Sequence, residues 1–99
     1  MFHILWEYRV REEKRSDFER HYSGDGTWAI LFRRASGYVG TTLLRDPEDG
    51  GRYLTIDVWD AAASFNRFKK DFAAEYAATD KQMEALTESE RRLGNFESV

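Results

Sequence analysis

The chain has 99 residues, a mass of 11.6 kDa and a net charge of −3, which predicts a single domain spanning residues 1–99. It contains no cysteine, so disulfides, thiol catalysis, cysteine-based zinc sites and iron–sulfur clusters are excluded. The negative charge argues against nucleic acid as a partner, because nucleic-acid-binding proteins rely on basic surfaces.

Aromatic side chains are the unusual feature of the composition. Seven Phe, five Tyr and three Trp make up 15% of the chain. A domain of this size buries only about 60–65% of the surface that its unfolded chain exposes. The placement of these rings therefore decides what the domain can bind.

The beginning of the chain predicts neither a membrane span nor a secretion signal. Its apolar stretch breaks at Glu7, and no basic residue precedes that stretch as it would in a signal peptide. No apolar run approaches the ~20 residues of a transmembrane helix. We therefore expect no membrane partner and a cytoplasmic location.

The first third of the chain predicts a strand followed by two short helices. Residues 2–10 alternate apolar and polar side chains with a period of two, which is typical of a strand. Phe18 and Tyr22 are four residues apart and share one face of a helix. Gly24-Asp25-Gly26 interrupts this helix, and a second helical piece contains Trp28.

The remainder predicts a hairpin, a long helical region and a last strand. Residues 38–45 and 52–59 read as strands joined by a turn rich in Pro and Gly, so they pair antiparallel. Helical patterns continue from Ala61 to just before Gly94, and residues 95–99 predict a short strand. The helical region carries an aromatic stripe at helical spacing, formed by Phe65, Phe68, Phe72 and Tyr76.

This order of elements is the ferredoxin-like βαββαβ pattern of the α+β class. It predicts a four-stranded antiparallel sheet with the helices on one face. Because Leu54, Ile56 and Val58 are uniformly apolar, we expect them to lie beneath the helices.

The other sheet face then carries Thr55 and Trp59 among charged side chains, with Arg9 paired to Asp57 or Glu7. Such a mixture is too apolar for open water and too charged for a monomer core. We therefore expect a homodimer in which the open sheet faces of two copies meet.

Several segments in the chain follow one another in a familiar order. They are Phe18…Tyr22…Gly26-Thr27-Trp28, Leu31-Phe32-Arg33-Arg34, Gly37-Tyr38-Val39-Gly40-Thr41, Leu44-Arg45-Asp46, Tyr53-Leu54, and Asp57-Val58-Trp59-Asp60 with Phe65. In this order they resemble the antibiotic biosynthesis monooxygenase (ABM) superfamily of dimeric α/β barrels. The resemblance covers most of the chain and implies a ligand pocket between the sheet and its helices.

Members of this superfamily differ in activity. Some are cofactor-independent monooxygenases of polycyclic aromatic hydroquinones, and others degrade haem or remove small electrophilic metabolites. Haem-degrading members use an Asn on the first strand, a Trp on the helix after the hairpin and a His further along it. The corresponding places here hold Tyr8, Phe68 and residues 76–78, which disfavours haem degradation.

The resemblance also directs attention to particular side chains as binding residues. An aromatic slot would have one wall on the second helical region and the other on the first strand and first helical region, formed by Trp6, Tyr8, Trp28, Phe68, Phe72 and Tyr76. Buried Tyr and Trp need hydrogen-bond partners, which favours a ligand site. The same rings serve equally well as an ordinary core between helix and sheet.

Candidate catalytic residues are Tyr22, His21 and Asn66. A histidine titrates near neutral pH and can act as a base toward a phenol, although His21 at a helix end needs no function. Tyr22 and Asn66 are residue types that the cofactor-independent oxygenases place around their pockets. The only other histidine, His3, is expected at the dimer interface, and two separated histidines predict no metal site.

Three functional hypotheses follow. The first is an ABM-like monooxygenase that oxidises a small aromatic or quinone-type molecule without a bound cofactor. The second is a non-catalytic dimer that binds a small aromatic ligand in the same pocket. The third is a structural dimer with a filled core and no ligand.

Overall fold

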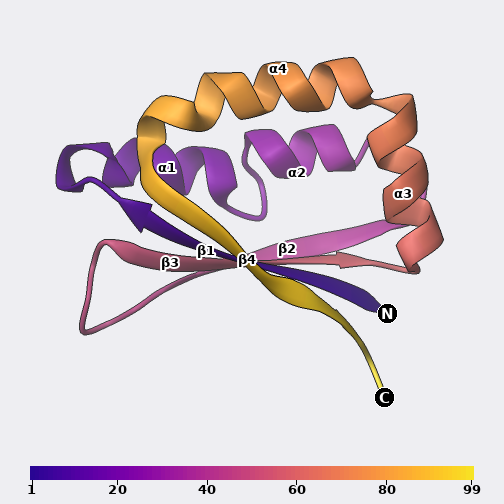
Figure 1. Ribbon diagram of the computed structural model, residues 1–99, viewed down its shortest axis with the longest axis horizontal. Coiled ribbons are helices and arrows are strands. Elements are labelled where there is room, and N and C mark those ends of the chain that lie inside the picture. Colours follow the sequence, from indigo (N-terminus) through magenta and orange to yellow (C-terminus); the bar gives the residue numbers. More distant parts are fainter.

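Four antiparallel strands form one sheet in the order β2-β3-β1-β4 in the computed structural model, which describes all residues from 1 to 99 (Figure 1). The strands are β1 (Phe2–Val10), β2 (Tyr38–Arg45), β3 (Arg52–Trp59) and β4 (Thr87–Glu97). The first three have the bounds that their patterns predict. Alternation alone was sufficient for β1, and alternation together with the Pro- and Gly-rich turn was sufficient for β2 and β3.

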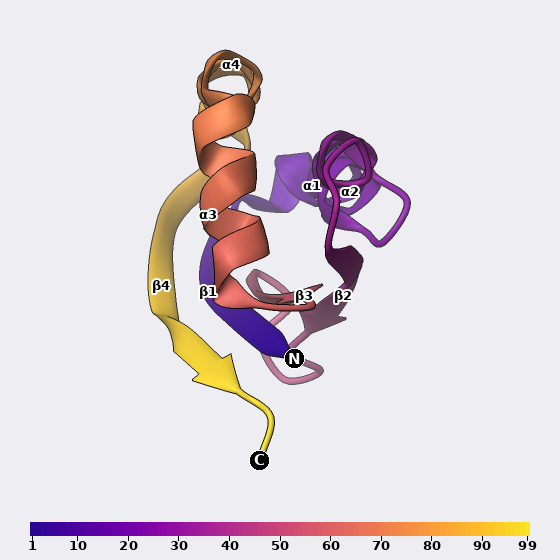
Figure 2. The same ribbon diagram turned by 90° about the vertical axis from the view of Figure 1, so that its right-hand side faces the viewer.

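The helices cover one face of this sheet. They are α1 (Arg15–Tyr22), α2 (Thr27–Phe32), α3 (Ala62–Asp71) and α4 (Ala73–Met83), with single 3₁₀ turns at Glu12–Lys14 and Glu84–Leu86. Figure 2 shows α1 and α2 beside α3 and α4, all on the same side of the strands. The ferredoxin-like prediction is thus confirmed. None of the helices is long and apolar enough to span a membrane.

The prediction for the two faces of β3 is wrong. Tyr53 lies opposite Tyr8, and Trp59 lies opposite Phe2, so these residues share the helix-covered face of the sheet. Tyr53 is 1% exposed and Trp59 is fully buried, which also excludes them from the open face. The aliphatic row of Leu54, Ile56 and Val58 therefore lies on the open face. A period of two identifies the two rows, but it does not say which row faces the helices.

The C-terminal part also differs from the prediction. Helix α4 ends at Met83, and residues from Thr87 onward form β4 along the edge of β1. Gly94 adopts φ = 152° where the β1–β4 register shifts, so it serves a β-bulge and not a helix end. The polar sequence of β4 hides its strand character, because an edge strand gains its stability from pairing with β1 and not from burial.

Two hydrophobic clusters fill the space between sheet and helices. The first is Tyr8, Val10, Phe18, Tyr22, Tyr53, Met83 and Leu86, and the second is Phe2, Ile4, Leu31, Phe32, Trp59 and Phe68. Trp6 and Trp28 are partly buried and pack against both clusters. The two tryptophans therefore mark the boundary at which the core divides.

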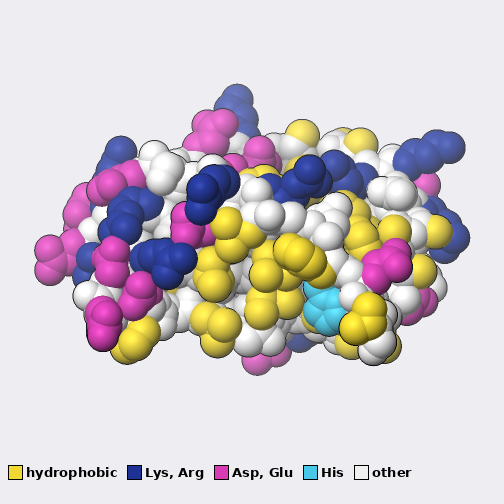
Figure 3. Space-filling model, turned by 60° about the horizontal axis from the view of Figure 1, so that its bottom comes forward, with side chains coloured by type: hydrophobic (Ala, Val, Ile, Leu, Met, Phe, Trp, Pro, Cys, Tyr) yellow, Lys and Arg dark blue, Asp and Glu magenta, His cyan; other side chains and the backbone are white.

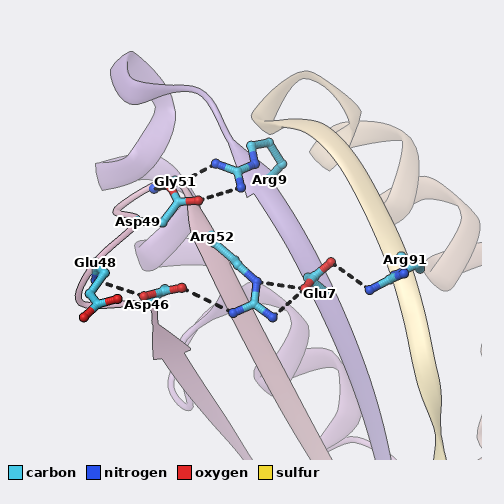
Figure 4. A network of polar contacts seen from close by, with 8 residues as sticks. All are labelled: Glu7, Arg9, Asp46, Glu48, Asp49, Gly51, Arg52 and Arg91. Carbon is cyan, nitrogen blue, oxygen red and sulfur yellow. Dashed lines mark hydrogen bonds and ion pairs between the residues drawn. The ribbon is translucent and has the colours of Figure 1, made fainter.

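Ion pairs gather at one end of the sheet (Figure 4). Arg9 donates two hydrogen bonds to Asp49, at 2.9 and 2.7 Å, and Arg52 pairs with Glu7 at 2.8 Å. The predicted pairing of Arg9 with Asp57 or Glu7 is therefore wrong. Asp57 lies opposite Ile4 on the helix-covered face, where Arg9 does not reach it.

Candidate active site

A cavity lies between the sheet and the helices, where the two clusters meet. Its volume is about 50 Å³. The lining consists of Trp6, Tyr8, Tyr22, Trp28, Phe32, Thr41, Thr55, Asp57, Tyr76, Asp80 and Glu90. These residues come from all four strands and from α1, α2 and α4, so the cavity exists only in the assembled fold.

Aromatic rings form most of the wall. Trp28 is central, because its ring lies 5.2 Å from that of Tyr76, 5.7 Å from that of Phe32 and 6.4 Å from that of Tyr22. On the sheet side, the rings of Trp6 and Tyr8 are stacked with centroids 6.3 Å apart. Flat walls of this kind suit a planar aromatic ligand, since offset and edge-to-face ring contacts are favourable.

The floor of the cavity contains a carboxyl group, Asp57. Thr41 on the neighbouring strand donates a hydrogen bond of 2.6 Å to Asp57 Oδ1. Asp57 is half-buried and forms part of the cavity lining. Burial raises the pKa of Asp57 to about 6, while the hydrogen bond from Thr41 acts in the opposite direction.

The three tyrosines of the cavity remain protonated at neutral pH. Burial raises the pKa of Tyr22 to about 12, and it also raises the pKa of Tyr8 and of Tyr76. Their phenols can therefore donate hydrogen bonds to a ligand, but they cannot accept protons from it.

Two buried polar atoms of the lining lack a hydrogen bond of good geometry, although their side chains lie close enough to the hydroxyls of Tyr22 and Tyr8 to lower the pKa of each. They are Trp28 Nε1, which can only donate, and Thr55 Oγ1, which can donate or accept. Unpartnered buried polar atoms cost about 1–3 kcal/mol each, so native folds keep few of them. Both residues belong to the cavity lining, so a small movement of the wall would bring these atoms within reach of an oxygen-bearing ligand.

The charges around the cavity are all negative. Asp80 and Glu90 join Asp57 in the lining, and no Lys, Arg or His does. Burial, and next the charge of Asp80, raises the pKa of Glu90 above its ordinary value. The site therefore presents carboxylates and aromatic faces together, without a basic group that would attract an anion.

The structure brings together five of the residues proposed from the sequence and separates the others. Trp6, Tyr8, Tyr22, Trp28 and Tyr76 line the cavity, as just described. Phe68 is buried in the core between Phe32 and Trp59, and Phe72 stacks on Phe68 with centroids 5.4 Å apart. These two phenylalanines support the cavity wall from outside.

Two of the three proposed catalytic residues also lie outside the cavity lining. His21 Nδ1 forms a 2.6 Å hydrogen bond with Thr27 Oγ1, which ties the end of α1 to the start of α2. Asn66 is exposed on α3. The sequence analysis proposed both residues because their side chains are chemically suitable. The type of a side chain does not determine the direction in which it points.

Sequence reasoning missed the polar half of the cavity, above all Asp57, Thr41 and Thr55. The signal was present in β3, whose helix-facing row interrupts large aromatic residues with a threonine and an aspartate. A charged residue in a buried row has to be explained by a partner or a cavity. The sequence pattern can be interpreted in this way only once this row of β3 is known to face the helices.

Comparison with known proteins places the chain in a family. The family model for antibiotic biosynthesis monooxygenases matches residues 1–82. SnoaB, a cofactor-independent oxygenase from Streptomyces nogalater, is 26% identical, with a TM-score of 0.69 over 99% of this chain and 92% of SnoaB.

A second solved structure, from Bordetella bronchiseptica and named for the same family, is 21% identical. It has a TM-score of 0.77 over 99% of this chain and 96% of its own, which shows a shared fold. No curated protein matches the sequence. Because the family model covers most of the chain, the protein belongs to the antibiotic biosynthesis monooxygenase family.

Proposed function

We propose that this protein is a cofactor-independent oxygenase that oxidises a small, electron-rich aromatic molecule bound in the cavity. The observation that carries the proposal is the composition of the cavity, in which aromatic walls surround unpartnered polar atoms and an enclosed carboxyl. The similarity to SnoaB, a cofactor-independent oxygenase, extends over nearly the whole chain and supports the same kind of reaction.

The chemistry needs an electron-rich substrate because no other reductant takes part. Oxidation of a hydroquinone by O₂ to a hydroxyquinone places one oxygen atom on a ring carbon that carried hydrogen and releases the other as water, and the substrate supplies all four electrons. Removing a proton from a phenol or an adjacent carbon leaves an anion, which gives up electrons to O₂ more readily than the neutral molecule. The protein then has to bind the substrate, take up that proton and exclude water.

The side chains of the cavity fit these tasks. Trp6 and Trp28 hold the ring between flat faces, and Trp28 Nε1 and Thr55 Oγ1 can bind its oxygen substituents. Tyr22, with its pKa raised to about 12, serves as a hydrogen-bond donor to the negative charge that develops on the substrate oxygen. In this proposal the candidate catalytic residue Tyr22 therefore acts as a hydrogen-bond donor and not as a proton acceptor.

The size of the cavity narrows the substrate class. At about 50 Å³ it is smaller than the apolar cavity of ~150 Å³ that holds benzene in an engineered protein. Even a substrate with one ring therefore requires the cavity to widen, and a polycyclic substrate requires more widening, so we propose a hydroquinone of one or two rings.

We also propose that a second copy of the chain covers the open sheet face. That face carries Leu5, Leu54, Ile56 and Val58 in its centre, and Leu44 and Phe96 nearby are 46% and 54% exposed. Figure 3 shows hydrophobic side chains gathered in the middle of this side of the molecule, with charged groups to one side. An apolar patch with a charged border is typical of an interface between proteins.

The function is tested by oxygen consumption. Purified protein is mixed with single-ring and two-ring hydroquinones in air-saturated buffer, and O₂ uptake and quinone absorbance are followed with and without catalase. We expect acceleration over buffer, with one atom of ¹⁸O₂ in the product. Uptake that catalase halves, with no ¹⁸O incorporation, would instead indicate an oxidase that releases peroxide.

Two other outcomes separate the alternative functions. Quenching of tryptophan fluorescence by the same compounds reports binding, because Trp6 and Trp28 line the cavity. Saturable quenching without turnover would support a non-catalytic binding protein. Neither quenching nor turnover over the whole panel would leave only a structural dimer.

A further inference from the structure

We propose that Asp57 is the general base of the oxygenase, and that Thr41 and Tyr38 form the route by which its proton leaves. The inference rests on the proposed function, since it names the group that takes the proton from the bound hydroquinone. It goes beyond that function because it assigns the proton acceptor to a strand residue on the cavity floor.

Asp57 has the position that a base requires. It lies on the helix-covered face of β3, directly opposite Ile4, and forms part of the cavity lining. Thr41 is the one hydrogen-bond donor to its carboxyl group, and the bond goes to Oδ1. Oδ2 therefore stays free to accept a proton from a phenol that lies between the two tryptophans.

No cation holds this carboxylate in its charged form. The titratable groups that share the cavity lining with it are Tyr8 on β1, Tyr22 on α1, Tyr76 and Asp80 on α4, and Glu90 on β4, and Tyr38 on β2 lies beside it through Thr41. They are phenols and carboxyl groups, and none neutralises a negative charge. The enclosed carboxylate is accordingly more basic than an ordinary aspartate, with a pKa of about 6 that suits proton transfer near neutral pH.

The other candidates for the base are less well placed. Tyr22 lines the cavity, but its pKa is raised to about 12, so it has no proton-accepting form at neutral pH. His21 is bonded to Thr27 and lies outside the cavity lining. Asp80 and Glu90 are exposed, so water competes with the substrate for them.

A chain of short hydrogen bonds connects Asp57 to the edge strand. Thr41 Oγ1 lies 2.6 Å from Asp57 Oδ1 and 2.6 Å from the hydroxyl of Tyr38, which is partly exposed at the start of β2. Tyr38 is fixed by its ring contacts with Phe32 and Trp59, at 5.4 and 5.3 Å. Three hydroxyl or carboxyl groups in line can pass a proton along.

The proton balance of this step is simple. The substrate O–H bond breaks, its electron pair stays on the substrate oxygen, and the proton joins the Asp57 carboxylate. The carboxyl group then turns its protonated oxygen toward Thr41 and the two hydroxyls reorient, so that Asp57 protonates Thr41 Oγ1 while the hydroxyl proton of Thr41 moves to Tyr38 and that of Tyr38 moves to solvent. One proton leaves the cavity, and each hydroxyl recovers its own protonation state.

The first test is Asp57→Asn, which keeps the shape and the bond from Thr41 but cannot accept a proton. We expect kcat/KM for the hydroquinone to fall ~100-fold or more, as when a general base is removed. The rise of kcat/KM with pH through about 6 should disappear with it. The matched control is Asp71→Asn on the exposed end of α3, which should keep wild-type activity and pH profile.

The second test compares two adjacent threonines of β2. Thr41→Val removes the donor that stabilises the charged carboxylate, so the acidic limb of the pH profile should move to higher pH. Thr42→Val alters the opposite face of the same strand, opposite Ile56, and should leave the limb in place. Tyr38→Phe should lower kcat while leaving KM unchanged, because only proton release is affected.

A binding measurement keeps this inference separate from the oxygenase itself. The absorbance of bound 4-nitrophenol reports its ionisation, and we expect the wild type to ionise the phenol more than Asp57→Asn does at the same pH. If the wild type consumes no O₂ but ionises the phenol through Asp57, the oxygenase proposal fails and the base assignment stands. Equal turnover or equal phenol ionisation in Asp57→Asn and wild type would overturn the base assignment alone.

Discussion

Thr41 donates a 2.6 Å hydrogen bond to Asp57 across the β2–β3 pair, and this is the one hydrogen bond that the cavity carboxyl accepts. The two residues are Cα partners in the register of the hairpin. The predicted hairpin therefore places the side chains of Thr41 and Asp57 together on the floor of the cavity. Burial of the Asp57 carboxyl group has a thermodynamic cost.

Asp57 should destabilise the fold at neutral pH. Its pKa is raised from 3.8 to about 6, so the folded protein holds this proton more tightly than the unfolded chain does. The contribution of Asp57 to stability is therefore greatest below pH 4, falls between pH 4 and 6, and stays lowered above pH 6. The shift corresponds to a loss on the order of 3 kcal/mol.

The free energy of unfolding in urea, measured across this pH range for wild type and Asp57→Asn, checks this. We expect the variant to lose that part of the pH dependence and to be the more stable protein at pH 7.5. Asp71→Asn again serves as the control, because that carboxyl is exposed. Identical curves for Asp57→Asn and wild type would show that the carboxyl is solvated in the folded state.

Trp28 should contribute to ligand binding through its N–H group as well as its ring. Trp28→Phe retains an aromatic wall but removes the unpartnered Nε1 donor. We expect the Kd for a hydroquinone, measured by calorimetry, to rise about tenfold, which is the value of one or two kcal/mol in a buried hydrogen bond.

Phe72→Leu is the matched control for this measurement. Phe72 stacks on Phe68 behind the cavity wall and does not line the cavity, so ligand affinity should not change. The sequence placed Phe72 among the binding residues. A tenfold loss of affinity in Phe72→Leu would restore that assignment and move the site toward α3.

The charge of the ligand should matter because the cavity lining contains only acidic charges. We expect neutral hydroquinone, or one bearing an amine, to bind several-fold more tightly than the same ring bearing a carboxylate. Asp80→Asn and Glu90→Gln should narrow this difference, and added salt should do the same. Glu84→Gln, on the exposed 3₁₀ turn, is the control. Tighter binding of the carboxylate by the wild type would contradict the prediction.

The open sheet face should mediate dimerisation. Ile56→Lys places a charge in the centre of the apolar row on that face, so a dimer held by it should dissociate. Light scattering at micromolar concentration should give twice the chain mass for the wild type and the chain mass for the variant. Ile30→Lys, at a position 57% exposed on α2, should stay dimeric. A monomeric wild type would refute the interface.

The fold could be predicted from the sequence wherever the signal was local. Strands 38–45 and 52–59 were predicted with their observed bounds because β-branched residues, alternation and a Pro- and Gly-rich turn coincide there. The last strand was predicted only over residues 95–99, and most of β4 was missed because its residues are mostly polar and exposed. Its pairing with β1 connects residues more than eighty positions apart, such as Glu7 and Arg91.

The candidate site was predictable in its aromatic half and not in its polar half. Trp6, Tyr8, Tyr22, Trp28 and Tyr76 were found because large rings at strand or helix spacing must face inward. Asp57 was missed because Leu54, Ile56 and Val58 were placed beneath the helices instead. That one reversal moved the whole helix-facing row of β3 to the wrong side.

The aromatic side chains that are so abundant in the sequence are divided between the hydrophobic core and the lining of the cavity. The sequence by itself determined the order of elements, the bounds of three strands and the family, because these depend on local periodicity, turn chemistry and short motifs. Only the tertiary structure decided which face of β3 the helices cover and which polar groups share a cavity. A strand pattern is symmetric between its two faces, and only packing against α1, α2 and α4 breaks that symmetry.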